Sequence, residues 1–184
     1  ISWLGDERVP LQRYLDFRRD ALAAAPSTDT VALALGLARA VRDGHPISQP
    51  APDELEVLVR EPVNAFAQAM TAAAQAADSW RSSKDRTRQM RREVATAAST
   101  LARRGPAGAL ESAPFSDAES FTFRAALFGH ALADGAPVAT ALTDLAVRLL
   151  VARELELGGR RSLGHPISVV MAAARGALRN AAPE

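Results

Sequence analysis

The stretch from Val63 to Arg104 reads VNAFAQAMTAAAQAADSWRSSKDRTRQMRREVATAASTLARR, and it decides the fold class. It contains neither glycine nor proline, the two residues that most often end a helix, and Gly105 follows it directly. The spacing of its apolar residues predicts one helix over residues 63–104, about 63 Å long at 1.5 Å per residue. The alternative is two helices that meet at the Ser-Ser-Lys stretch 82–84.

A heptad register fits this stretch. Apolar or small residues recur at the a and d positions of successive heptads, as they do in helices that pack lengthwise against a partner. Alanine dominates the first half of this seam, which would let a partner helix approach closely. The seam consists of Phe66, Ala69, Ala73, Ala76, Trp80, Ser83, Thr87, Met90, Val94, Ala97 and Leu101.

Glycine and proline divide the rest of the chain into further helices. We expect Ser27 or Thr28 to cap the second helix, and Ser116 and Glu119 to form a capping box. The helix from residue 138 is apolar nearly all round, which predicts a buried position. The predicted helices outside 63–104 cover residues 10–25, 28–43, a short segment from 53, 116–134, 138–157 and 166–180.

Length and composition set the fold class. The chain has 184 residues, of which 48% are hydrophobic and only 5% aromatic. Alanine-rich runs with few β-branched or aromatic residues argue against a sandwich or barrel. The sequence therefore predicts an all-α fold of about seven helices, in which a long basic, heptad-patterned helix over 63–104 packs in a bundle. We expect one domain over residues 1–184, cut from a larger protein that begins before Ile1, with a sub-boundary at the loop 105–116.

Several kinds of site are not expected. The chain has no cysteine, so disulfides, thiolate nucleophiles and cysteine-ligated metals are ruled out. Its three histidines show no HxxxH or HxxH spacing, and we expect no metal and no cofactor. No apolar run is long enough to span a bilayer, and residues 1–13 do not resemble a signal peptide. These features predict a soluble, cytoplasmic protein.

Charge is concentrated in one segment. From Arg81 to Arg104, basic residues outnumber acidic ones by six, whereas the whole chain has a net charge of +1. Arginine side chains match the geometry of phosphate groups, so this segment is a candidate for binding nucleic acid or an anionic surface. The candidate anion-binding residues are Arg81, Arg86, Arg88, Arg91 and Arg92.

Arg124 and His130 are separated by five residues. This pair resembles the signature of the HEPN family of all-helical ribonucleases, and Arg160 with His165 has similar spacing. The resemblance implies metal-independent RNA cleavage by a dimer, with Arg124 stabilising the phosphate and His130 acting as acid or base.

The sequence contains no paired acid and base on one helix face, no phosphate-binding loop and no nucleophile elbow. We therefore predict a non-enzymatic protein-interaction or scaffold domain that forms a homodimer or binds a protein partner through the seam 66–101. The nucleic-acid-binding module and the HEPN-like ribonuclease are the alternatives. The predicted contact residues are Phe66, Trp80, Met90, Val94 and Leu101.

Overall fold

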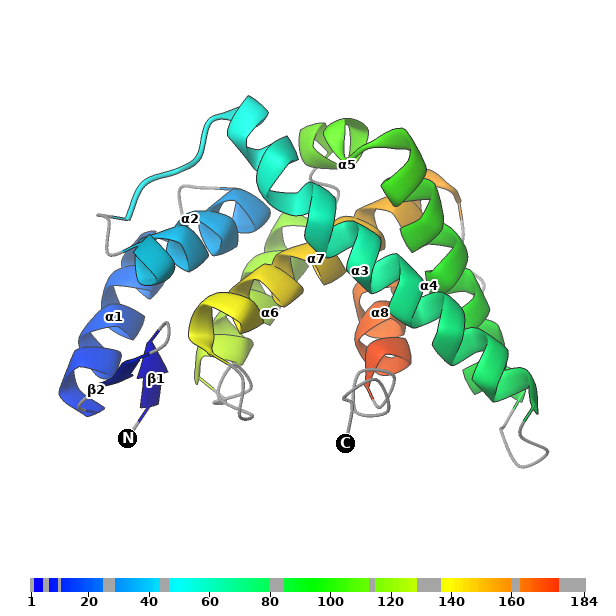
Figure 1. Ribbon diagram of the computed structural model, residues 1–184, viewed down its shortest axis with the longest axis horizontal. Helices are drawn as coiled ribbons and strands as arrows, with labels where there is room; N and C mark the ends of the chain where they lie inside the picture. Colours follow the sequence, from blue (N-terminus) through cyan, green and yellow to red (C-terminus); the bar gives the residue numbers. More distant parts are fainter. Residues whose placement is uncertain are drawn as a thin grey trace. The chain divides into compact units, whose positions relative to one another are not determined.

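The structure is a computed structural model that describes residues 2–4, 7–9, 11–24, 29–43, 47–79, 85–112, 115–128, 137–159 and 163–175. Within these ranges it contains eight helices and one short hairpin, which confirms the predicted all-α fold (Figure 1). The hairpin pairs β1 (Ser2–Leu4) with β2 (Glu7–Val9) in antiparallel register. The helices are α1 (Leu11–Ala24), α2 (Thr30–Asp43), α3 (Pro52–Ser79), α4 (Asp85–Arg104), α5 (Ala107–Glu111), α6 (Ser116–Phe128), α7 (Val138–Leu157) and α8 (Pro166–Ala174).

The chain divides into two compact units. Unit 1 comprises residues 1–58 and 115–146, and unit 2 comprises residues 59–114 and 147–184. The boundaries between the units fall inside α3 and α7, so each of these helices contributes to both units. None of the described helices combines the length and the apolar character needed to cross a membrane.

In unit 1, α2 packs against α6 and is buried along most of its length. The backbone N–H groups of Val31 and Ala32 both donate to Oδ1 of Asp29 at 3.0 Å, so Asp29 caps this helix. The predicted caps Ser27 and Thr28 lie outside the described residues. Asp caps a helix as well as Ser does, and its carboxylate also favours the positive end of the helix dipole.

A second cap marks the start of α3. The carboxylate of Glu54 accepts the backbone N–H of Ala51 at 3.1 Å and pairs with Arg39 of α2 at 3.2 Å. The hydrogen bond from Ala51, followed by the interaction with Arg39, holds the pKa of Glu54 below its ordinary value. The helix begins beside the predicted start at residue 53, but it is not short, because it continues through Pro62. Proline in a helix interior removes one hydrogen bond without necessarily ending the helix.

Gly36 lies in the middle of α2, where α2 meets the segment 47–50. A Cβ atom built on Gly36 would overlap with the carbonyl oxygen of Ser48 and would lie 3.2 Å from Cδ of Pro50. The backbones therefore approach each other more closely than any other residue would permit.

Tyr14 of α1 is fully buried. Burial raises the pKa of its hydroxyl above the ordinary value of 10.0, although the positive charge of Arg18 opposes part of this shift. Because the folded-state pKa is the higher one, the contribution of Tyr14 to stability is fully present below about pH 10. That contribution is lost as the pH rises through the folded-state pKa.

The rise in the pKa of Tyr14 can be measured without interference from other tyrosines, because Tyr14 is the only tyrosine of the chain. We expect the ultraviolet absorbance of tyrosinate to appear at a higher pH in the native protein than in the protein unfolded by urea. Equal midpoints in the two states would contradict the burial of the hydroxyl.

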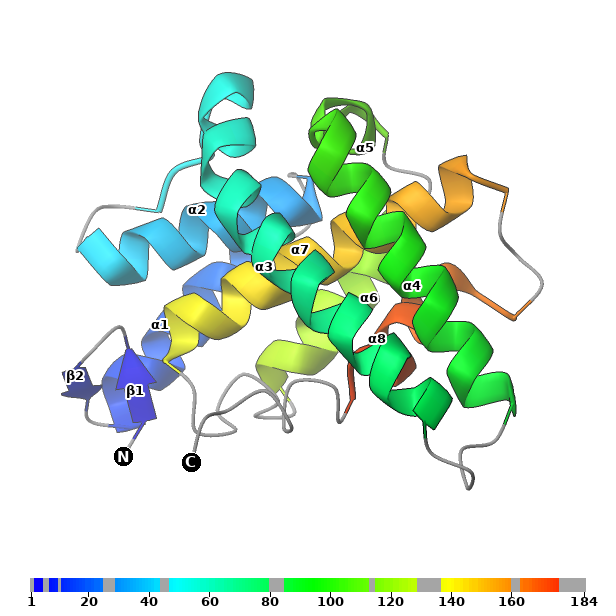
Figure 2. The ribbon, with the colours of Figure 1, turned by 45° about the vertical axis from the view of Figure 1, so that its right-hand side comes forward.

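In unit 2, α3 and α4 lie side by side and run in opposite directions (Figures 1 and 2). The prediction of one continuous helix over 63–104 is therefore wrong, and the two-helix alternative is the one observed. Residues 80–84, which include the Ser-Ser-Lys stretch, lie outside the described residues. Serine has a lower helix propensity than alanine and favours helix starts, which is consistent with α3 and α4 being separate helices.

The packing of unit 2 rests on α4, α7 and α8. Helix α4 packs against α8, and Gly105 ends α4 with a positive φ of 83°. The predicted loop after α4 contains the short helix α5. In α7, Arg153 is fully buried, and its Nη1 donates to the carbonyl oxygen of Ala109 in α5 at 3.1 Å. The predicted burial of α7 is confirmed, since nearly every residue from Val147 to Leu155 is buried.

Candidate functional site

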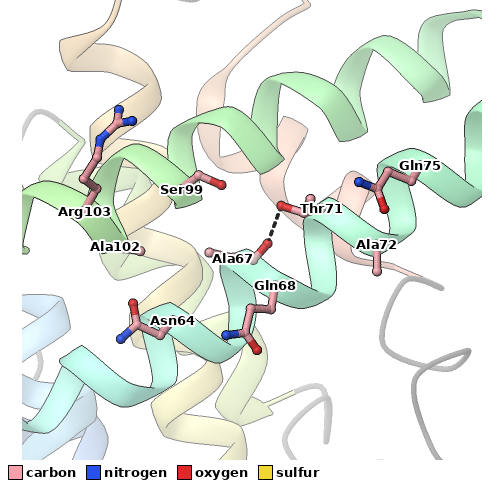
Figure 3. Close-up of a pocket in the computed structure, with 9 residues that line it drawn as sticks. All are labelled: Asn64, Ala67, Gln68, Thr71, Ala72, Gln75, Ser99, Ala102 and Arg103. Atoms are coloured by element: carbon pink, nitrogen blue, oxygen red, sulfur yellow. Dashed lines mark hydrogen bonds between the residues drawn. The ribbon is translucent and has the colours of Figure 1, made fainter.

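A groove between α3 and α4 is the candidate functional site (Figure 3). Its volume is about 540 Å³, and it lies entirely within unit 2. Helix α3 supplies the longer wall, which extends over about three turns. The α3 residues that line it are Asn64, Ala67, Gln68, Thr71, Ala72 and Gln75.

Helix α4 supplies the opposite wall with Ser99, Ala102 and Arg103. Small residues of both helices therefore face the groove between them, and Arg103 is the only charged residue among those that line it. In Figure 3, Arg103 stands at the same end of the groove as Asn64. A ligand at this site would meet a shallow surface of small side chains with one positive charge at one end.

The hydroxyl of Thr71 is already used within its own helix. It donates to the carbonyl oxygen of Ala67 at 2.8 Å, as Figure 3 shows. The amides of Asn64, Gln68 and Gln75 supply the wall of α3 with both hydrogen-bond donors and acceptors.

The outward surface of α3 carries no charge over four turns. From Val63 to Ala77 the sequence contains no Asp, Glu, Lys or Arg. The residues of this segment that are exposed to solvent are Asn64, Ala65, Gln68, Ala72, Gln75 and Ala76. A helix face that meets only water usually carries charged residues, so this uncharged surface is a candidate contact surface. We call these six residues the neutral face of α3.

The outward surface of α4 differs in charge. Its exposed residues are Asp85, Arg86, Gln89, Arg92, Thr96, Ser99, Arg103 and Arg104, so Asp85 is the one acid among them. We call Arg86, Gln89, Arg92, Thr96, Ser99 and Arg103 the basic face of α4. Asp85 lies at the start of the helix on the same side as Arg92 and Arg103.

Four of the five predicted anion-binding residues lie in the described part of α4. Arg86 and Arg92 belong to the basic face, and Nη2 of Arg86 also donates to the carbonyl oxygen of Leu163 at 3.2 Å. Arg88 and Arg91 are half-buried, and Arg88 lies 3.8 Å from the carboxylate of Asp85. The predicted cluster is thus divided between two sides of the helix.

Arg81, the fifth predicted residue, lies outside the described residues. Arg103 was not among the predicted anion-binding residues, although it shares the basic face with Arg86 and Arg92.

The predicted contact residues of the heptad seam are placed differently. Phe66, Val94 and Leu101 are 5%, 0% and 1% exposed, so they pack inside the chain's own core. Met90 is half-buried, and Trp80 lies outside the described residues. Phe66, Val94 and Leu101 are therefore not available to a partner.

The heptad register is correct for α4 but wrong for α3 beyond Phe66. The buried stripe of α3 continues through Met70, Ala74 and Ala77, and the register had assigned Ala76 to the seam, where it is exposed. A single heptad register can hold over both α3 and α4 only if the two segments form one continuous helix. Because the chain reverses between α3 and α4, each helix turns its own apolar face inward.

The ribonuclease-like pair cannot be assembled from the described residues. Arg124 is exposed on α6, whereas His130 and Arg160 lie outside the described residues. In the part of the chain that the structure describes, no group of three His, Asp or Glu side chains could hold a metal ion.

Comparison of the chain with known protein families, with curated proteins and with solved structures finds no match. The geometry of the groove and of its two flanking faces is therefore the basis for assigning a function.

Sequence reasoning did not single out Asn64, Gln68, Gln75, Ser99 and Arg103, which line the groove. A signal for them was present, because an uncharged run from 63 to 77 leaves an exposed helix face without charge. This uncharged run can be interpreted only when the buried side of α3 is known, because alanine residues fit buried and exposed positions equally well.

Proposed function

We propose that this chain is a non-enzymatic protein-interaction domain, and that the groove between α3 and α4 receives a helix. The observation that carries this proposal is the neutral face of α3, which lacks charge from Val63 to Ala77 and borders the groove. The expected cytoplasmic location and homodimeric state are further proposals.

The small side chains of the groove favour a helix as the occupant. Helices pack at interaxial distances of about 8–10 Å, and the shortest distances require small residues at the contact. Ala67, Ala72, Ser99 and Ala102 meet that requirement. The contact surface proposed here differs from the heptad seam, in which Phe66, Val94 and Leu101 are buried.

The proposal is tested by placing a photo-crosslinking amino acid at Gln68 in the cells that produce this protein. We expect a covalent protein adduct at position 68, because this residue is exposed and lines the groove. The matched control carries the same amino acid at Ala125, an exposed position on α6. The proposal is wrong if position 68 gives no more adduct than position 125.

The basic face of α4 supports a second candidate function, which is the binding of a nucleic acid. Arg86, Arg92 and Arg103 are exposed and outnumber Asp85, the one exposed acid of α4. The amide and hydroxyl groups between the arginines are types that contact phosphate and sugar. Phosphate contacts of this kind release counterions, so affinity would fall steeply with salt.

Fluorescence anisotropy of labelled single- and double-stranded nucleic acid tests this candidate at about 150 mM salt, where the Debye length is about 8 Å. We expect Arg86→Glu with Arg92→Glu to abolish binding. The control, Arg13→Glu with Arg42→Glu, makes the same charge change at exposed positions of α1 and α2. Equal affinity of the two double variants would exclude the basic face as the binding site.

A further inference from the structure

We infer that the helix received by the groove belongs to another protein and carries carboxylate side chains on the flank that faces α4. This inference rests on the proposed function and names the chemistry of the partner. It is drawn from the difference in charge between the two walls of the groove.

The wall that α3 forms does not select a charge. By their spacing, the amides of Asn64, Gln68 and Gln75 share one side of the helix, and all three line the groove. An amide both donates and accepts hydrogen bonds, so it can meet a neutral, an acidic or a basic side chain. No Asp, Glu, Lys or Arg occurs over residues 63–77. The preference for one sign of charge therefore comes from α4.

The wall that α4 forms is positive. Ser99 and Arg103 line the groove, and Arg92 precedes them on the same side of the helix. The sequence contains no Asp or Glu over residues 94–110, whereas it contains both Arg103 and Arg104 there. Among the described residues, no carboxylate forms an ion pair with Arg103. Its charge is therefore available to a carboxylate of the partner, which an arginine can hold through two parallel hydrogen bonds.

Both acidic residues of α4 lie away from this wall. Asp85 is the first residue of the helix and lies about four turns, or about 21 Å, before Ser99. Glu93 is half-buried and lies about 120° around the helix axis from Ser99. A carboxylate in the groove would therefore meet arginine without a nearby acid to repel it. A lysine or arginine of a partner would instead meet like charge, which disfavours binding.

Arg92 and Arg103 also set the spacing of the carboxylates. The two arginines are about three turns apart on one side of α4, which is about 16 Å at 1.5 Å per residue. A partner helix that lies alongside α4 presents the side chains of one flank at the same repeat. We therefore expect the partner to carry two Asp or Glu residues about eleven positions apart on that flank.

Charge reversal at the groove tests the inference in the cells that produce this protein. With the photo-crosslinking amino acid at Gln68, we expect Arg103→Glu to lower the yield of the protein adduct about tenfold, because glutamate would repel the partner's carboxylates. The control, Arg104→Glu, makes the same change at the neighbouring exposed residue, which does not line the groove. An equal yield from the two variants would overturn the inference.

Synthetic peptides test the charge of the partner with the purified chain. The probes are two labelled, alanine-rich helical peptides of about 20 residues, one with two glutamates at the expected spacing and one with glutamines in their place. Fluorescence anisotropy at about 150 mM salt should show about tenfold tighter binding of the glutamate peptide. Arg103→Glu should abolish this difference, and Arg104→Glu should retain it. Equal affinities of the two peptides, or no measurable binding of the glutamate peptide, would contradict the inference.

The inference and the proposed function fail in different ways. If the crosslinker at position 68 captures a protein but the glutamate peptide binds no better than the glutamine peptide, the inference is wrong and the proposed function stands. An adduct of twice the mass of the chain would identify a second copy as the occupant and would also overturn the inference. If position 68 gives no more adduct than position 125, both are wrong.

Discussion

Replacing Arg153 with alanine is expected to lower the free energy of unfolding by about 3–5 kcal/mol, the range found for large buried side chains. Arg153 is fully buried in α7, and its guanidinium donates to the carbonyl oxygen of Ala109 at 3.1 Å. The substitution removes this hydrogen bond and leaves a cavity. Removing the buried charge regains only part of the lost free energy, because the carbonyl oxygen of Ala109 in α5 loses the donor that Arg153 supplied.

Two further variants separate these effects in urea unfolding. Arg153→Met retains much of the volume without the hydrogen bond, so we expect it to lose less stability than Arg153→Ala. Arg104→Ala removes an exposed arginine of α4 and should change stability by less than about 0.5 kcal/mol. If Arg153→Ala were as stable as Arg104→Ala, the buried guanidinium would not contribute to the core.

Replacing Gly36 with alanine is expected to destabilise the protein by about 1–3 kcal/mol, although the same change in an ordinary helix interior stabilises it by about 1 kcal/mol. The sign reverses because the new Cβ atom would overlap with the carbonyl oxygen of Ser48. That oxygen belongs to the backbone, so neither partner can move aside by changing a rotamer.

Gly108 in α5 provides the matched control for this substitution. A Cβ atom at Gly108 would meet no atom within 4 Å, so Gly108→Ala should be neutral or stabilising by up to about 1 kcal/mol. Thermal unfolding of both variants compares them directly. A Gly36→Ala protein that is as stable as the Gly108→Ala protein would show that α2 and the segment 47–50 do not approach closely.

Local signals in the sequence were sufficient to predict most of the helices. Gly105 ends α4, the acidic residues after Pro52 start α3, and the apolar pattern from Val138 correctly predicted a buried α7. Each of these features depends on a few neighbouring residues. The hairpin at residues 2–9 and the short helix α5 were not expected, because three to five residues carry too little pattern to be distinguished from a loop.

The reversal of the chain between α3 and α4 could not be chosen over a straight helix from the sequence alone. Both fit the absence of glycine and proline from Val63 to Arg104. The difference lies in tertiary packing, which turns Met70 inward on α3 and Val94 inward on α4. The buried side of each helix determines which residues are exposed to solvent. The candidate groove is formed by residues that remain exposed in this way.

The division of the two units along the sequence has a consequence for the order of events during synthesis. Unit 1 needs residues 115–146, and unit 2 needs residues from 147 onward, in addition to their earlier segments. The core of unit 1 is complete only after residues 115–146 have left the ribosome, and that of unit 2 only after residues beyond 147 have done so. The apolar side of α2 must wait for α6, which lies far downstream, and contacts between such distant segments form slowly. Nascent chains of intermediate length therefore expose apolar surface, which makes them natural clients for chaperones.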